Sequence, residues 1–275
     1  MTDVEQPSLT RAQRRRDRDT TTREDLSGPL VLVRALAVLA IAGLAVLAVH
    51  AGPLFVAGLL VWAAAGIAWG WPQVAALSSG WRLSFVVVLT GLLVAAAVVT
   101  VEDDPRLRLV PVALAIGIVV TFLLQLLRSD GRTALTLEVI ATATAVAVIG
   151  IGAGLVGTAL HRHGTELITI SMAAVGAAAL ADPLATRLRD RSWLVPVAMV
   201  LGALAALGAA SALGGLTWGV ALLLGMFVGA LSYAVRTVVA GEPASHTLAG
   251  VLAAACASVL SVGALTQVAT LVLSR

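Results

Sequence analysis

The side chains of this sequence that are best suited to chemistry lie in three short polar segments between long apolar runs. Each segment combines arginines with carboxylates, over residues 125–138, 182–191 and 233–242. A guanidinium group binds a phosphate through two parallel hydrogen bonds. If the three segments converge in the folded chain, they form a binding site for an anionic headgroup, a phosphate or a nucleotide. The candidate residues of this site are Arg128, Arg132, Asp182, Arg187 and Arg236.

The same residues have a second interpretation that needs no site. Arginines are retained on the cytoplasmic side of a membrane during insertion, and they contact anionic lipids there. Asp182 is a candidate cation ligand. Because Pro183 follows it, Asp182 is also a candidate N-cap of a short helix that begins at this point.

Two further polar segments carry residue types that bind metals elsewhere. The segment His161-Arg162-His163-Gly164-Thr165-Glu166 contains two histidines and a carboxylate, and Glu102-Asp103-Asp104-Pro105 contains three carboxylates. In the histidine segment, which suggests zinc, ligands so close along the chain are difficult to direct at one tetrahedral ion. For the acidic segment, the alternative to a charged turn is weak calcium binding. We therefore interpret both segments as solvated turns and predict no metal site.

The composition shows which class of protein carries these polar segments. Of 275 residues, 59% are hydrophobic and 12% are charged, and the mean hydropathy is +1.00, which excludes a water-soluble globular domain. All 18 basic residues are arginines, so lysine chemistry is excluded. The net charge of +3 is too small to indicate a nucleic-acid partner. The single cysteine, Cys256, cannot form a disulfide within the chain.

The apolar runs predict an all-α, polytopic transmembrane bundle of about nine helices. Each run is near the ~20 residues that cross a bilayer, and none alternates as the strands of a membrane barrel do. The turns at His50-Ala51-Gly52-Pro53 and Gly214-Gly215 are the shortest. If Gly214-Gly215 is only a kink, there are eight helices. The predicted spans are Pro29 to Val49, Leu54 to Gly70, Leu83 to Val101, Leu109 to Leu127, Thr136 to Leu160, Leu167 to Ala181, Trp193 to Leu213, Leu216 to Val239 and Thr247 to Leu273.

Arginine placement predicts the orientation. With the N-terminus inside, fourteen of the 18 arginines lie in inner segments and four in outer ones. Residues 1–28 are strongly charged and nearly free of large apolar side chains, which predicts a disordered cytoplasmic tail before a transmembrane domain over residues 29–275. The alanine-rich, lysine-free composition favours a bacterial origin, and hence the cytoplasmic membrane.

The predicted helices carry no ionisable group at mid-membrane. Such groups usually mark ion or proton pathways. Small residues instead recur at packing distances, as in Gly150, Gly154 and Gly157, or Gly225 and Gly229, and predict close helix packing within the chain, with dimerisation as the alternative. Thr266 and Gln267 are expected to form hydrogen bonds between helices.

One part of the chain resembles a known family. An apolar run ends in Leu126-Leu127-Arg128-Ser129-Asp130-Gly131, a second covers Thr136 to Val156, and a third ends at Ala181-Asp182-Pro183. Over about Leu114 to Pro196 this order is similar to that of the bacterial phosphatidate cytidylyltransferases, or CDP-diacylglycerol synthases. The resemblance implies a transferase acting on a phospholipid, with Asp182, Arg128 and Arg132 at the inner interface and Mg²⁺ as cofactor. The family's C-terminal metal-binding signature, which ends in Asp-Arg-x-Asp, is absent from the corresponding region, Tyr233 to His246.

The sequence therefore leaves three functions open. The first is a non-catalytic membrane protein whose arginine-rich inner face contacts anionic lipids, or a cytoplasmic protein through residues 1–28. The second is the cytidylyltransferase-like enzyme. The third is a small-molecule transporter, which requires polar groups at the midplane or broken helices.

Overall fold

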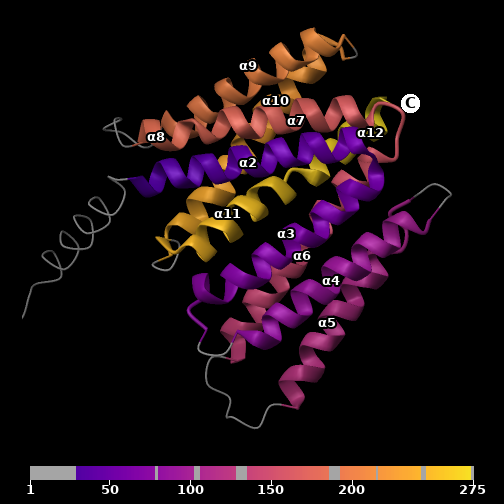
Figure 1. The fold of residues 1–275 in the computed structure, drawn as a ribbon, viewed down its shortest axis with the longest axis vertical. Coiled ribbons are helices and arrows are strands. Elements are labelled where there is room, and N and C mark those ends of the chain that lie inside the picture. Colours follow the sequence, from indigo (N-terminus) through magenta and orange to yellow (C-terminus); the bar gives the residue numbers. More distant parts are fainter. Residues whose placement is uncertain are drawn as a thin grey trace, which may run out of the picture.

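The chain folds into a bundle of α-helices (Figure 1). The computed structural model describes residues 29–77, 80–101, 106–127, 135–185, 193–214, 216–242 and 246–273, and it contains no strand within these ranges. The helices are α2 (Pro29–Ala51), α3 (Pro53–Val74), α4 (Trp81–Val99), α5 (Val110–Leu126), α6 (Leu135–Ala159), α7 (Gly164–Ala179), α8 (Ala181–Ala185), α9 (Leu194–Leu213), α10 (Trp218–Ala240), α11 (Leu248–Leu260) and α12 (Gly263–Leu273).

The fold confirms the predicted polytopic helical bundle. Every predicted apolar run is helical, and eight spans in the described part of the chain are long and apolar enough to cross a membrane, with α7 and α8 counted as one span and α11 and α12 as another. The remaining apolar helix, α5, has 17 residues, which corresponds to about 26 Å at ~1.5 Å per residue. The protein is thus a multi-pass membrane protein. Residues 1–28, predicted to form the tail, lie outside the described residues.

Two glycines with positive φ lie at turns between consecutive helices. Gly52, at φ 128°, is the only residue between α2 and α3, and Gly214, at φ 73°, ends α9. Both angles lie in the region that side chains with a Cβ rarely adopt. The Gly214-Gly215 break therefore separates two helices, as predicted, and is not a kink.

The last predicted span is not continuous, which corrects the single helix expected from Thr247 to Leu273. Ser261 and Val262 form a turn between α11 and α12. The Ser261 hydroxyl donates to the carbonyl of Ser258 over 2.8 Å, and the Thr266 hydroxyl donates to the carbonyl of Gly263 over 2.8 Å. Such side-chain hydrogen bonds replace helix bonds at a break inside a membrane. The break turns the chain from α2 and α3, against which α11 packs, to α6, against which α12 packs.

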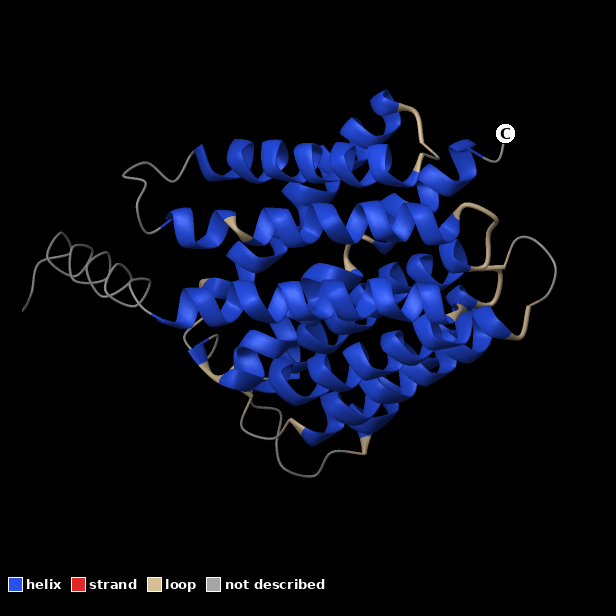
Figure 2. Ribbon diagram, turned by 45° about the horizontal axis from the view of Figure 1, so that its top comes forward, coloured by secondary structure: helices blue, strands red, loops and turns tan. Residues whose placement is uncertain are grey.

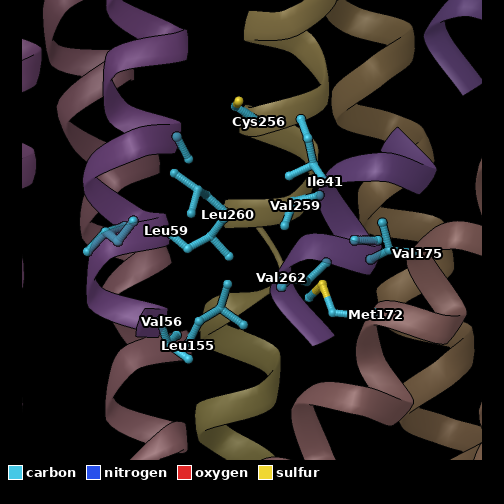
Figure 3. Close-up of a cluster of buried hydrophobic side chains, with 14 of the residues drawn as sticks. Ile41, Val56, Leu59, Leu155, Met172, Val175, Cys256, Val259, Leu260 and Val262 are labelled. Atoms are coloured by element: carbon cyan, nitrogen blue, oxygen red, sulfur yellow. The ribbon is translucent and has the colours of Figure 1, made fainter. Parts of the chain in front are cut away.

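Apolar side chains from neighbouring helices pack around this break. Figure 3 shows Val259, Leu260 and Val262 between side chains from the neighbouring helices, among them Ile41 of α2 and Met172 of α7. All five are nearly or completely buried. The break lies in the hydrophobic core of the bundle.

Glycines bring several helix pairs into backbone contact. A Cβ on Gly202 of α9 would meet the carbonyl oxygen of Gly225 of α10, and a Cβ on Gly154 of α6 would meet that of Gly263 of α12. This confirms that the glycine spacing serves helix packing within the chain. Dimerisation through these small-residue faces stays a prediction.

The ends of the helices alternate between two faces of the bundle (Figures 1 and 2). We call the face that contains the beginning of α2 the N-terminal face. The ends of α3, α7 and α10 and the beginning of α11 also lie there, and α8 lies at its edge (Figure 1). This face therefore receives polar segments that are far apart in the sequence.

Candidate binding site at the N-terminal face

A buried ion pair joins α8 to α10 at the N-terminal face. The Arg236 Nε donates to Asp182 Oδ2 over 2.9 Å, and Arg236 Nη2 donates to Asp182 Oδ1 over 3.3 Å. The side chain of Arg236 is 6% exposed and that of Asp182 is 15% exposed. Two nearly parallel hydrogen bonds of this kind are the strong geometry of an arginine–carboxylate pair.

Two further acceptors fix the guanidinium group of Arg236. Its Nη1 donates to the Ser232 hydroxyl over 2.6 Å, and its Nη2 donates to the carbonyl of Ala178 over 3.0 Å. The ring of Tyr233 lies beneath the group, with its centroid 6.0 Å from Arg236 Cζ. The site therefore holds one rigidly placed cation that is connected to α7, α8 and α10.

Local sequence explains how Arg236 reaches these partners. Ser232 and Arg236 are four residues apart and share one face of α10. The helix packs on α7, and the residues near the contact are small, with Ala178 and Ala181 fully buried. The short side chains let α10 approach closely enough for the arginine to bind a backbone carbonyl of α7.

Asp182 does not have the capping role that the sequence suggested. It lies inside the five-residue helix α8, in its first turn, whereas an N-cap residue precedes the first turn. Its carboxylate accepts hydrogen bonds from Arg236 instead. The nearby buried cation explains why an aspartate is tolerated here.

Arg34 of α2 is the third charged member of the site. It is partly buried and interacts electrostatically with Asp182. Arg34 and Arg236 also line one small crevice between α2, α10 and α11. The other lining residues are Val38, Ala240, Val251, Ala254 and Ala255. We call Arg34, Asp182 and Arg236 the arginine cluster; it contains two cations and one anion.

The structure brings together two of the five predicted site residues, Asp182 and Arg236, from sequence segments 54 residues apart. Arg128, Arg132 and Arg187 lie outside the described residues. Arg34 was missed as a site residue, because the sequence analysis counted it only among the arginines that predict the orientation of the chain in the membrane.

The first predicted polar segment is not part of this cluster as far as it is described. Gln125 and Glu138 lie on α5 and α6. Figure 1 places α5 at the edge of the bundle farthest from α9, and α5 packs on α4 and α6. Gln125 and Glu138, the described polar residues of the first segment, therefore do not lie at the Arg236 site.

The histidine segment forms a turn at residues 161–163 and the beginning of α7 at residues 164–166. His163 Nδ1 lies 3.6 Å from Glu166 Oε2, and the His161 ring forms a hydrogen bond of 2.8 Å with the carbonyl of Gly157. Across the described ranges, no group of three or more His, Cys, Asp or Glu side chains is arranged to hold a metal ion. The acidic segment 102–105 lies outside these ranges.

The expected hydrogen bonds between helices in the last span are present for Gln267 and absent for Thr266. The Thr158 hydroxyl of α6 donates to Gln267 Oε1 over 3.1 Å. The Thr266 hydroxyl binds the carbonyls of Val262 and Gly263, at the beginning of its own helix, so that prediction was wrong. Thr270 is the residue that joins the contact, because its hydroxyl donates to Thr158 Oγ1 over 3.3 Å.

Comparisons with protein-family models, with curated proteins and with solved structures give no match for this chain. The resemblance to the phosphatidate cytidylyltransferases thus stays a prediction. Functional inference rests on the arginine cluster and its surroundings.

Proposed function

We propose that this chain is a multi-pass protein of the bacterial cytoplasmic membrane that binds an anionic membrane lipid through the arginine cluster. The observation that supports this is that Arg34 and Arg236, one partly buried and one buried, line the same crevice near one end of the bundle. Arginine side chains at this position reach the anionic phosphates of membrane lipids.

The depth of the cluster suits a lipid headgroup. Arg34 is five residues after the beginning of α2, and Arg236 is four residues before the end of α10. At ~1.5 Å per residue both lie about 6 to 8 Å inside the helix ends. This is near the boundary between hydrocarbon and headgroups, where arginine side chains reach anionic phosphates.

The proposed orientation places the N-terminal face in the cytoplasm, because fourteen of the 18 arginines then lie inside. We predict that a membrane-impermeant thiol reagent does not label Arg16→Cys in intact cells but does label Arg108→Cys. The native Cys256 is fully buried and gives little background. Labelling of Arg16→Cys from outside, with Arg108→Cys protected, would show that the orientation is inverted.

We predict that Arg34→Gln removes the stabilisation of the purified protein by an anionic lipid. The glutamine is similar in length but cannot neutralise a phosphate, so the apparent affinity should fall at least tenfold, about the value of one charge-assisted hydrogen bond. The measurement is the unfolding temperature in detergent micelles that contain phosphatidylcholine and increasing phosphatidylglycerol, because a ligand that binds the folded state raises this temperature.

The matched control for that experiment is Arg108→Gln, which removes one exposed arginine from the opposite face. We expect it to respond to phosphatidylglycerol as the wild type does. If both variants lose the stabilisation by phosphatidylglycerol equally, the lipid responds only to the net charge of the protein, which contradicts the proposed site. If Arg34→Gln keeps this stabilisation, the proposed function is also contradicted.

A cytoplasmic partner protein bound through residues 1–28 is compatible with this proposal, as is a homo-oligomer. For the enzyme alternative, Asp182 would have to hold Mg²⁺ beside a triphosphate. Both of its carboxylate oxygens accept hydrogen bonds from Arg236. This favours a structural role for the carboxylate over a role as a magnesium ligand. For the transporter alternative, Figure 3 shows apolar side chains beside the break in the last span, and the buried hydroxyls of Ser258, Ser261 and Thr266 there bind backbone carbonyls.

A further inference from the structure

We infer that the bundle consists of two rigid groups of helices that tilt against each other along an apolar seam and open towards the N-terminal face. Group A contains α3, α4, α5, α6, α11 and α12, and group B contains α2, α7, α8, α9 and α10. The inference goes beyond the proposed function, because it concerns a motion of the protein and does not require a bound lipid.

The first argument is the distribution of close glycine contacts. In the described part of the chain, each glycine that brings two helices into close contact joins helices of one group, apart from Gly164 beside the turn from α6 to α7. Helices in such contact have little freedom to shift without a clash, so each group moves as a unit. The contacts include those of Gly66 and Gly70 with α11 and of Gly154 with α12 in group A, and those of Gly176 with α2 and of Gly202 and Gly225 between α9 and α10 in group B.

Hydrogen bonds between helices strengthen each group from within. In group A, Trp71 Nε1 donates to the carbonyl of Ala141 over 3.1 Å, and this bond joins α3 to α6. The Thr158 hydroxyl donates to Gln267 Oε1 over 3.1 Å and joins α6 to α12. In group B, the buried pair of Arg236 with Asp182 joins α10 to α8. These directional contacts make each group rigid.

The seam between the groups is apolar at the centre of the bundle. Figure 3 shows Ile41 and Met172, from group B, near Val259 and Val262 at the break in group A. All four side chains are nearly or completely buried. Apolar contacts have no preferred direction, so packed helices that meet in this way can slide by small amounts.

The helix α11 is held more closely to group A than to group B. It packs more extensively on α3 than on α2 or α10. The small crevice between α2, α10 and α11 lies on the seam, where Val38 of α2 and Val251 of α11 both line it. The packing is therefore less complete along the seam than between α11 and α3.

The links between the groups indicate where the hinge lies. Gly52 alone joins α2 to α3, and the four residues 160–163 join α6 to α7; both links lie opposite the N-terminal face. The third link, the seven residues 241–247 between α10 and α11, can extend to about 23 Å. Figure 1 shows the groups diverging from the short links towards the N-terminal face, with α11 between them. The two short links act as the hinge, and the motion is largest at the N-terminal face.

Distances between pairs of spin labels on introduced cysteines test this motion. The native Cys256 is fully buried and is not labelled. Ile140→Cys on α6 with Val238→Cys on α10 spans the seam, and Leu36→Cys on α2 with Val238→Cys lies within group B; all three positions are exposed. In phosphatidylcholine nanodiscs, we expect the pair across the seam to have a distance distribution at least twice as wide as that of the pair within group B.

A third pair tests the position of the hinge. Arg108→Cys, before α5, with Trp218→Cys, at the beginning of α10, spans the seam at the opposite face, and both positions are exposed. We expect its distribution to be as narrow as that of the pair within group B. Equal widths for all three pairs would overturn the inference, because the bundle would then be one rigid body. A wide distribution at both faces would also overturn it, because the groups would then separate without a hinge. The lipid proposal is independent of these outcomes, since no anionic lipid is present.

Discussion

Asp182→Asn is expected to destabilise the folded bundle strongly. The substitution preserves the shape of the side chain but leaves the guanidinium of Arg236, which is 6% exposed, without its counter-charge. Removing one partner of a buried ion pair lowers the free energy of unfolding by about 3 to 5 kcal/mol. For a chain of this size that corresponds to a fall in unfolding temperature on the order of 10 °C.

Two variants control for this prediction. Glu242→Gln removes an exposed carboxylate near the end of α10 and should leave the unfolding temperature unchanged. Replacing both partners with apolar residues, as Asp182→Leu with Arg236→Met, should recover much of the lost stability, because no buried charge then remains unpaired. An unfolding temperature for Asp182→Asn equal to that of Glu242→Gln would show that the pair does not support the fold.

Gly202→Leu is expected to have the second large effect, by separating α9 from α10. Any Cβ at Gly202 would meet the carbonyl oxygen of Gly225 and approach Gly229 Cα at 3.1 Å. Both are backbone atoms, which cannot rotate away as a side chain does. Overpacking against rigid neighbours lowers the free energy of unfolding by about 3 kcal/mol or more. The measurement is thermal or denaturant unfolding of the purified protein.

Gly208→Leu on the same helix is the matched control. Gly208 is exposed, and nothing lies within 4 Å of its ideal Cβ position. Leucine favours helix more than glycine does, by up to about 1 kcal/mol, so Gly208→Leu should be neutral or slightly stabilising. If Gly202→Leu and Gly208→Leu have equal stability, the close contact between α9 and α10 is not as the structure shows it.

The helices could be predicted from sequence because the signals that define them are local. A run of about 20 apolar residues must satisfy its own backbone hydrogen bonds in a membrane, and glycine or proline at each turn marks its ends. The break at Ser261-Val262 is not predicted in this way. Serine and glycine are common inside membrane helices, and only the packing of α11 on α3 and of α12 on α6 makes the chain turn there.

The arginine cluster could be predicted only in part, because packing between distant helices leaves no local signal in the sequence. Asp182 and Arg236 stand out as charges at the ends of apolar runs, but their pairing depends on how α8 and α10 pack. Arg34 looks like one of many arginines that fix orientation. Its place beside Arg236 depends on the packing of α2 and α10 around α11, which no spacing along the chain reveals.

Native mass spectrometry of the protein from micelles with equal amounts of phosphatidylglycerol and phosphatidylcholine tests the lipid proposal most directly. We predict that the wild type and Arg108→Gln retain one phosphatidylglycerol per chain in preference to phosphatidylcholine, and that Arg34→Gln retains the two lipids equally. Retention of phosphatidylglycerol by Arg34→Gln at the wild-type level, or no preference in the wild type, would contradict the proposal.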